Sequence, residues 1–160
     1  MIRLRSVLTF LVKFIATGFY SGLSPVAPGT MGTIPGLLII WLFSFDQLIA
    51  PYVLYLPILA LGYWVIKLYE ANKQTHDPRE IVIDEMLGFS LIFLFIPVSW
   101  PLLLAGFVCF RLFDMTKIGP VGWCERTWHG TPMGTLLDDL MAGLLSVFVI
   151  QVFIHIGLLS

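Results

Sequence analysis

Residues 136–160 read LLDDLMAGLLSVFVIQVFIHIGLLS: two adjacent aspartates, followed from residue 140 onward by a stretch without Asp, Glu, Lys or Arg. A helix needs about 20 apolar residues to cross a bilayer. Stretch 140–160 meets this requirement directly, and so does stretch 47–66. The sequence therefore predicts an all-α integral membrane protein with carboxylates at the edge of a membrane helix.

Composition supports this class. The 160 residues suit a single domain over 1–160, and 58% of them are hydrophobic while only 12% are charged. A soluble domain has about 25% charged residues, so lipid must solvate much of this surface. A net charge of −1 without a basic run excludes a nucleic-acid binder, and two cysteines at no metal spacing exclude a disulfide scaffold. Nothing implies a protein partner.

Two further uncharged stretches, 14–45 and 86–110, are broken by Gly and Pro. Residues 21–33 read SGLSPVAPGTMGT, which predicts irregular backbone inside the protein or around a wet cavity. Residues 34–45 are left to form a helix that begins at most one turn earlier. Asp46, between two apolar runs, is expected in a solvated turn.

Stretch 86–110 contains Pro97 and Pro101, and a helix over 86–96 covers only about 16 Å of a ~30 Å core. It forms either one kinked span or a hairpin. Short cytoplasmic loops are rich in Lys and Arg, and the basic residues cluster in 3–13, 67–79 and 111–126. All three clusters share one side only if 31–66 and 86–110 are both hairpins, and we favour that topology.

The N-terminal segment is amphipathic, with Ser6, Thr9, Lys13 and Thr17 on one face and Val7, Leu8, Leu11, Phe14 and Ile15 on the other. This pattern is typical of a helix that lies in the membrane interface. We therefore expect about three to five membrane-embedded helices, including one short re-entrant or hairpin pair, besides this interfacial helix.

The acidic residues are the anomaly. Asp77-Pro-Arg-Glu80 predicts a helix start, with Asp77 as N-cap and Pro78 at the first helical position. Asp84 and Glu85 then fall two turns into that helix, at the edge of an apolar segment, where a charge is costly unless it is paired or metal-bound.

The same arrangement recurs at Asp114, which ends the second arm of the hairpin, and at Asp138 and Asp139, which open the last span. Small residues stand one turn after three of these acids and permit close helix approach in lipid: Gly88, Ala142 and Gly143. We expect the five carboxylates to converge. The alternative is that they only favour helix dipoles.

Converging carboxylates repel one another without a counter-charge, and hard oxygen ligands suit Mg²⁺. Mg²⁺ and cationic side chains together neutralise phosphate oxygens and position the attacking water, which is what phosphoryl transfer requires. The predicted metal ligands and catalytic residues are Asp84, Glu85, Asp114, Asp138 and Asp139. The predicted substrate-binding residues are Thr30, Arg111, Lys117, Arg126 and His129.

Four blocks carry a resemblance: Gly22–Thr33, Ile81–Gly88, Phe110–Lys117 and Leu136–Gly143. In order and spacing they resemble the bacterial phosphatidylglycerophosphatase A family. The resemblance implies Mg²⁺-dependent removal of the terminal phosphate from phosphatidylglycerophosphate in the bacterial inner membrane, and it gives the five acids the family's metal and catalytic roles. The basic clusters beside the acids favour a site on the cytoplasmic side. The chain departs from the family pattern at Lys117-Ile-Gly-Pro120 and Gly130-Thr-Pro132, which puts the conformation of loop 117–135 in doubt.

Other chemistries fit less well. Neither cysteine begins a Cys-x5-Arg pattern and Asp114 begins no Asp-x-Asp, so attack by metal-activated water is preferred over a side-chain nucleophile. For residues 21–33, a phosphate-binding loop with Thr30 as donor competes with a plain helix break. The alternative function is a small cation transporter or channel with an acidic pathway, although that would place acids near mid-membrane rather than at span ends.

Overall fold

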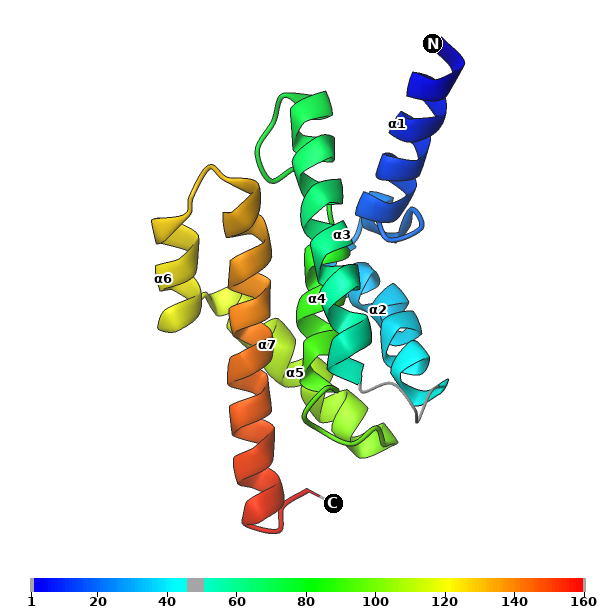
Figure 1. Cartoon of the computed structure of the whole chain (residues 1–160). Coiled ribbons are helices and arrows are strands. Elements are labelled where there is room, and N and C mark those ends of the chain that lie inside the picture. Colours follow the sequence, from blue (N-terminus) through cyan, green and yellow to red (C-terminus); the bar gives the residue numbers. More distant parts are fainter. Residues whose placement is uncertain (1, 46–50, 160) are drawn as a thin grey trace.

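The computed structural model describes residues 2–45 and 51–159, and every regular element in those ranges is helical (Figure 1). The elements are α1 (Ile2–Ala16), the short 3-10 helix η1 (Ser21–Leu23), α2 (Pro28–Phe45), α3 (Pro51–Lys73), α4 (Ile83–Ile92), α5 (Trp100–Thr116), α6 (Pro120–Thr127) and α7 (Pro132–His155). The all-α class is confirmed. The number of membrane helices stays a prediction, and the turn expected at Asp46 lies outside the described residues.

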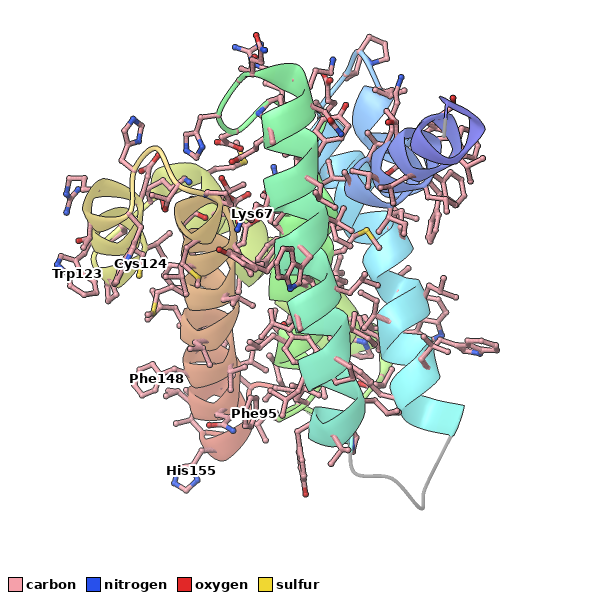
Figure 2. All side chains as sticks on the ribbon, turned by 45° about the horizontal axis from the view of Figure 1, so that its top comes forward. Lys67, Phe95, Trp123, Cys124, Phe148 and His155 are labelled. Carbon is pink, nitrogen blue, oxygen red and sulfur yellow. The ribbon has the colours of Figure 1, made fainter. Side chains whose placement is uncertain are left out.

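Two helices, α3 and α7, are long and apolar enough to cross a bilayer. Only 28% of the apolar window of α3 and 39% of that of α7 are buried inside the protein, whereas the core helix of a soluble protein is mostly buried. Large apolar side chains such as Leu56 and Phe148 project from them, and Figure 2 shows Phe148 pointing away from α7. These apolar surfaces suit lipid as their solvent.

Helix α4 forms the centre of the molecule. It has only 10 residues, about 15 Å at 1.5 Å per residue, and all but Glu85 are buried. The longer helices α2, α3, α5 and α7 pack around it. A short helix surrounded in this way has its ends inside the protein, so polar groups at its first turn face other helices rather than bulk water.

Helices α4 and α7 approach each other closely at a point where two glycines meet. A Cβ atom on Gly143 would overlap the carbonyl oxygen of Gly88, and a Cβ atom on Gly88 would lie 2.5 Å from the carbonyl oxygen of Asp139. The predicted role of these small residues is thereby confirmed. Asp84 precedes Gly88 by four residues in α4, and Asp139 precedes Gly143 by four residues in α7. The glycine contact therefore holds the two aspartates on adjacent turns of the two helices.

The chain reverses between α4 and α5, which confirms the hairpin geometry predicted for 86–110. The turn lies at the end of the molecule that also holds the C-terminal end of α7, as the positions of Phe95 and His155 in Figure 2 show. On the return, Phe110 is fully buried and its ring centroid lies 6.1 Å from that of Phe89. Arg111, one residue later, comes back to the level of Glu85.

Helix α1 is confirmed as a helix, and its exposed face carries Val7, Leu8, Phe10 and Leu11, while Val12 and Ala16 are buried. The placement of this helix in the membrane interface stays a prediction.

Helix α2 begins earlier than expected, at Pro28 rather than near residue 34. Proline suits a first helical position, and glycines inside a helix are tolerated where a neighbour occupies the space of their missing side chains. Val82 and the Glu85 carboxylate fill that space at Gly32. The expectation of irregular backbone was therefore wrong for 28–33, although 24–27 is non-helical and Ala27 has a φ of 47°.

The helix start predicted at Asp77 was also wrong. Asp77 has a φ of 44°, and α4 begins only at Ile83, so Asp84 and Glu85 lie in its first turn. The reason is a tertiary hydrogen bond: the Val82 N–H donates to the carbonyl oxygen of Ala16 at 3.0 Å, which ties this segment to the end of α1. In the loop 117–135, the unexpected helix α6 begins at Pro120, and the Thr131 side chain caps α7 by accepting from the Gly134 N–H.

Replacing Gly143 by Ala should force α4 and α7 apart, because the new methyl group would overlap backbone that cannot move alone. We expect a loss of about 1–3 kcal/mol of unfolding free energy, the usual cost of overpacking. The matched control is Gly106→Ala in α5, where the nearest atom is the tip of the Phe93 ring, 3.0 Å away, and the change should cost under about 1 kcal/mol. Thermal unfolding in detergent measures both, and equal stability of the two variants would contradict the tight contact.

Lys73 is the last residue of α3, Ile118 follows α5 after the hairpin, and Leu158 follows the C-terminal end of α7. In a background with both cysteines replaced by Ala, a cysteine at 73 or 118 should react with an impermeant maleimide from one side of the membrane, and a cysteine at 158 from the other. Labelling of 73 and 118 from opposite sides would make 86–110 a single span.

Candidate active site

A polar cavity of about 290 Å³ lies at the end of the bundle where α2, α4 and α7 begin and α5 ends. It brings together all five predicted carboxylates. Its lining residues are Ala27, Pro28, Gly29, Asp77, Arg79, Ile81, Asp84, Glu85, Arg111, Asp114, Lys117, Thr135, Asp138 and Asp139. We call this space the acid cavity. Carboxylates that are up to 62 positions apart in the sequence thus share one site.

Negative charge exceeds positive charge in the acid cavity. Six carboxylates line it against three basic side chains, so three negative charges are in excess when all are ionised. Three of the carboxylates are also well shielded from water, with exposed fractions of 5% for Asp84, 7% for Asp138 and 4% for Asp139. Buried like charges at close range raise the free energy of the folded state unless a cation or a proton joins them.

Arg111 bridges two of the acids. Its Nη1 lies 3.1 Å from Oε1 of Glu85 and 2.6 Å from Oδ2 of Asp114, and the side chains of all three are mostly buried. The guanidinium therefore links the first turn of α4 to the last turn of α5. Such charge-assisted hydrogen bonds are stronger than neutral ones and fix the level at which the hairpin closes.

Lys117 performs the same role on the other side of the cavity, where its Nζ donates to Oδ2 of Asp138. The residue caps α5 in the left-handed region, with a φ of 50°, which turns the chain towards α6. Burial by itself lowers the pKa of Lys117, but the hydrogen bond and charge of Asp138 outweigh it and raise the pKa above its ordinary value. Lys117 is thus a permanent cation in this cavity.

Two aspartates also accept from the backbone. Oδ1 of Asp84 accepts from the N–H of Glu85 at 2.9 Å, and Oδ1 of Asp138 accepts from the N–H of Asp139 at 3.0 Å. In both pairs the first carboxylate is oriented by the residue that follows it.

Glu85 lies directly over the start of α2. A Cβ atom on Gly29 would overlap its Oε1, and one on Gly32 would lie 2.8 Å from its Oε2. Oε2 is buried and accepts no hydrogen bond from any residue in 2–45 or 51–159. A buried carboxylate oxygen without a partner is costly, and it points to a further ligand at this position.

The donor set suits a hard divalent cation, since it offers several carboxylate oxygens, the unpartnered Oε2 of Glu85 and an excess of negative charge. As placed, however, the side chains of the described residues include no ready group of three or more His, Cys, Asp or Glu that could hold a metal ion. Arg111 and Lys117 occupy carboxylate oxygens instead. Metal binding therefore requires some carboxylates to turn away from these ion pairs.

The predicted substrate-binding residues divide into two groups. Arg111 and Lys117 line the acid cavity, whereas Thr30 follows the lining residue Gly29 without lining the cavity itself. His129 lines an adjoining polar cavity of about 370 Å³ together with His76, Asp77, Glu125, Gly134, Thr135 and Asp138. Arg126 is exposed and lines neither of the two cavities.

The sequence interpretation missed Asp77 and Arg79 as site residues, because it assigned the segment 77–80 to a helix start. It also missed Glu70, which is buried in α3 and accepts from the Asp77 N–H at 3.1 Å and from Oγ1 of Thr135 at 3.0 Å. Nδ1 of His76 lies 3.2 Å from the same carboxylate oxygen. A glutamate near the end of a predicted apolar span was the available signal.

Glu80 has a structural role outside the acid cavity. Its Oε1 lies 2.6 Å from Nζ of Lys73 and accepts from the Tyr69 hydroxyl at 2.8 Å. These two hydrogen bonds lower the pKa of Glu80 below its ordinary value. The residue therefore anchors the loop after α3 as a carboxylate.

The sequence matches one family model and several known proteins over most of its length. The family model described as Phosphatidylglycerophosphatase A matches residues 14–154. The chain is 36% identical over 155 residues to the Phosphatidylglycerophosphatase A of Escherichia coli (strain K12), covering 91% of this chain and 87% of that protein. It is 30% identical over 141 residues to the protein of the same name from Haemophilus influenzae, covering 87% and 86%.

Another relative, from Bacteroides thetaiotaomicron, bears the name "Putative phosphatidylinositol-3-phosphatase" and is 33% identical over 153 residues, covering 90% of this chain and 94% of that protein. No solved structure matches the chain. Because the family model spans nearly the whole chain and includes every residue from Gly29 to Asp139 that lines the acid cavity, the chain belongs to the phosphatidylglycerophosphatase A family.

Proposed function

We propose that this protein is a Mg²⁺-dependent membrane phosphatase that converts phosphatidylglycerophosphate into phosphatidylglycerol and phosphate. The observation that carries the proposal is the convergence of five carboxylates from α4, α5 and α7 in one cavity with Arg111 and Lys117. Family membership supports the reaction class, since relatives over most of the chain are named as phosphatases of this lipid phosphate monoester.

The residues that would hold Mg²⁺ are Asp84, Glu85, Asp114, Asp138 and Asp139. Bound among them, the ion supplies charge neutralisation for phosphate oxygens and a water of lowered pKa. The excess of negative charge and the unpartnered Oε2 of Glu85 favour this assignment.

The incoming phosphate has donors of its own. Helix α2 has 18 residues and begins beside the cavity, so the unpaired N–H groups of its first turn and its dipole favour an anion there. Arg111 and Lys117 add two cations. Substrate phosphate competes with Glu85, Asp114 and Asp138 for these cations, and the carboxylates released from them become available as ligands.

Hydrolysis then follows from the groups present. Water attacks phosphorus in line with the glycerol oxygen, the bond from phosphorus to that oxygen breaks, and the glycerol oxygen takes a proton from solvent water to leave as the alcohol, while the proton lost by the attacking water returns to solvent. A cavity carboxylate accepts a proton from the attacking water, in the manner of a general base. The cationic side chains balance the charge that develops on the phosphate oxygens.

Two alternatives are weaker. A transporter would need acids along a path through the membrane, whereas these acids gather in one cavity and the family model that matches the chain describes a phosphatase. The second alternative is a phosphatase for another lipid head group, as the name of the Bacteroides relative indicates for that protein. An assay of phosphate release from a panel of lipid phosphate monoesters distinguishes the two, and we expect the fastest release from phosphatidylglycerophosphate.

The orientation is part of the proposal. The end of the bundle that carries the acid cavity also carries Lys73, Arg79 and Lys117. Basic residues favour the cytoplasmic side of a membrane. We therefore place the site on the cytoplasmic face of a bacterial inner membrane.

Asparagine at Asp84, Asp114 or Asp139 should lower turnover by about 10²-fold or more, because each change removes a charged ligand while nearly preserving volume. Glu80→Gln, which changes an acid outside the cavity, is the matched control and should retain most activity. Phosphate release from the lipid in detergent micelles, with and without EDTA, measures the effect. Full activity in EDTA, or in all three asparagine variants, would refute the metal site.

Thr30 tests the start of α2. If its hydroxyl donates to the transition state, Thr30→Ala should lower turnover by about 10²–10³ and Thr30→Ser should restore most of it. Circular dichroism and Mg²⁺ affinity, measured on the same samples, should stay unchanged. Equal turnover of the Ala and Ser variants would leave phosphate binding at α2 to the backbone N–H groups alone.

A further inference from the structure

A second, apolar depression lies beside the acid cavity on the same helices. It has a volume of about 210 Å³, and we call it the α2–α5 groove. Its lining residues are Thr33, Ile34 and Leu37 of α2, Phe89 of α4, and Trp100, Leu103, Leu104 and Phe107 of α5. The single polar member, Thr33, donates its hydroxyl to the carbonyl oxygen of Thr30 at 2.7 Å, so it presents no unsatisfied donor.

The groove is in register with the acid cavity. On α2, Gly29 lines the cavity and Thr33 the groove; on α4, Glu85 lines the cavity and Phe89 the groove. On α5, which runs in the opposite direction, Arg111 lines the cavity and Phe107 the groove. Each step is four residues, about one helical turn or 5.4 Å, so three helices pass from polar to apolar lining at the same level.

The groove is open at its rim and closed at its floor. Phe89 is only 3% exposed, whereas Ile34, Leu37 and Leu104 are 57%, 41% and 66% exposed. Helices α2 and α5 both pack on α4 and form the two walls. An opening of this kind admits a hydrocarbon chain sideways, from the hydrophobic surface of the molecule, to a position one helical turn from the residues that line the acid cavity.

We propose that the α2–α5 groove binds an acyl chain of the substrate lipid while its phosphate lies in the acid cavity. The inference rests on the proposed function and adds the place where the lipid part is held. The argument for this occupant is continuity: an amphiphile with an anionic phosphate and a hydrocarbon chain matches a cavity that holds Arg111, Lys117 and metal-suited carboxylates, with an apolar groove one helical turn away on the same three helices. Burial of methylene groups there would contribute binding free energy.

Another apolar cavity, separate from the α2–α5 groove, provides a control. It has about 240 Å³ and lies on the other side of α2, lined among others by Leu38, Leu42 and Leu61. Leu37 and Leu38 are adjacent and similarly exposed, at 41% and 45%, but only Leu37 lines the groove. Leu37→Trp therefore fills the groove, and Leu38→Trp adds the same bulk elsewhere.

The first test compares kcat/KM for a long-chain and a short-chain form of phosphatidylglycerophosphate in detergent micelles. Filling the groove should lower the ratio of long-chain to short-chain kcat/KM by about tenfold, because the lost contact is worth one or more methylene groups. Leu38→Trp should keep the wild-type ratio. A ratio in Leu37→Trp within twofold of wild type overturns the groove, while failure of the wild-type protein to hydrolyse either lipid overturns the proposed function instead.

The second test does not need turnover. A lipid phosphate monoester with a diazirine on one acyl chain is photolysed with the protein, and peptides are mapped by mass spectrometry. We expect labelling within Trp100–Phe107 and around Leu37, reduced by an excess of unlabelled lipid phosphate monoester and not by phosphatidylcholine. Equal reduction by phosphatidylcholine would show bulk lipid in the groove, and labelling confined to the Leu38 side would place the chain elsewhere; either result overturns the proposal.

Discussion

The structure depends on the backbone contact between α4 and α7 at Gly88 and Gly143. Neither position has room for a Cβ atom, because each faces a carbonyl oxygen of the other helix. Helices that approach this closely in lipid gain packing contacts that larger side chains would prevent. The consequence is chemical as well as structural, since the residues one turn earlier are Asp84 and Asp139. The packing that stabilises the bundle therefore also brings buried carboxylates together. Their mutual repulsion is an energetic cost of the same helix contact.

That repulsion explains the position of the cations. Arg111 reaches Glu85 and Asp114 from the end of the hairpin, and Lys117 reaches Asp138 from the cap of α5. Both basic residues stand where α5 returns to the first turn of α4, so the hairpin supplies counter-charge to the acids that α4 and α7 assemble. With every carboxylate ionised, three negative charges remain in excess in the cavity. A site balanced in this way favours an additional cation or proton, which is the electrostatic basis of the proposed metal dependence.

Much of this could be predicted from the sequence because the signals were local. The charge-free stretches indicated the helices, and the small residues beside the acids indicated close packing. Pro97 and Pro101 indicated a break, and the three basic clusters favoured a reversal of the chain there. The failures share a cause: tertiary contacts that no local pattern encodes. Val82 bonds to the carbonyl of Ala16, which delays α4 until Ile83, and Glu85 fills the space at Gly29 and Gly32, which lets α2 begin at Pro28. Glu70 escaped notice because its partners, the Asp77 N–H and Thr135, lie in other elements.

Because α4 is short, it lines both the polar acid cavity and the apolar α2–α5 groove. With 10 residues, it carries Glu85 in its first turn and Phe89 one turn later, so a single helix contributes to both the acid cavity and the α2–α5 groove. If 86–110 formed one full-length span, the chain would end on the opposite side of the membrane, and Arg111 would lie far from Glu85. The hairpin instead returns α5 to the same level, which aligns polar with polar and apolar with apolar lining across three helices. The proposed binding of a phosphate in the acid cavity and of a hydrocarbon chain in the groove depends on that alignment, and the broken stretch 86–110 is the part of the sequence that provides it.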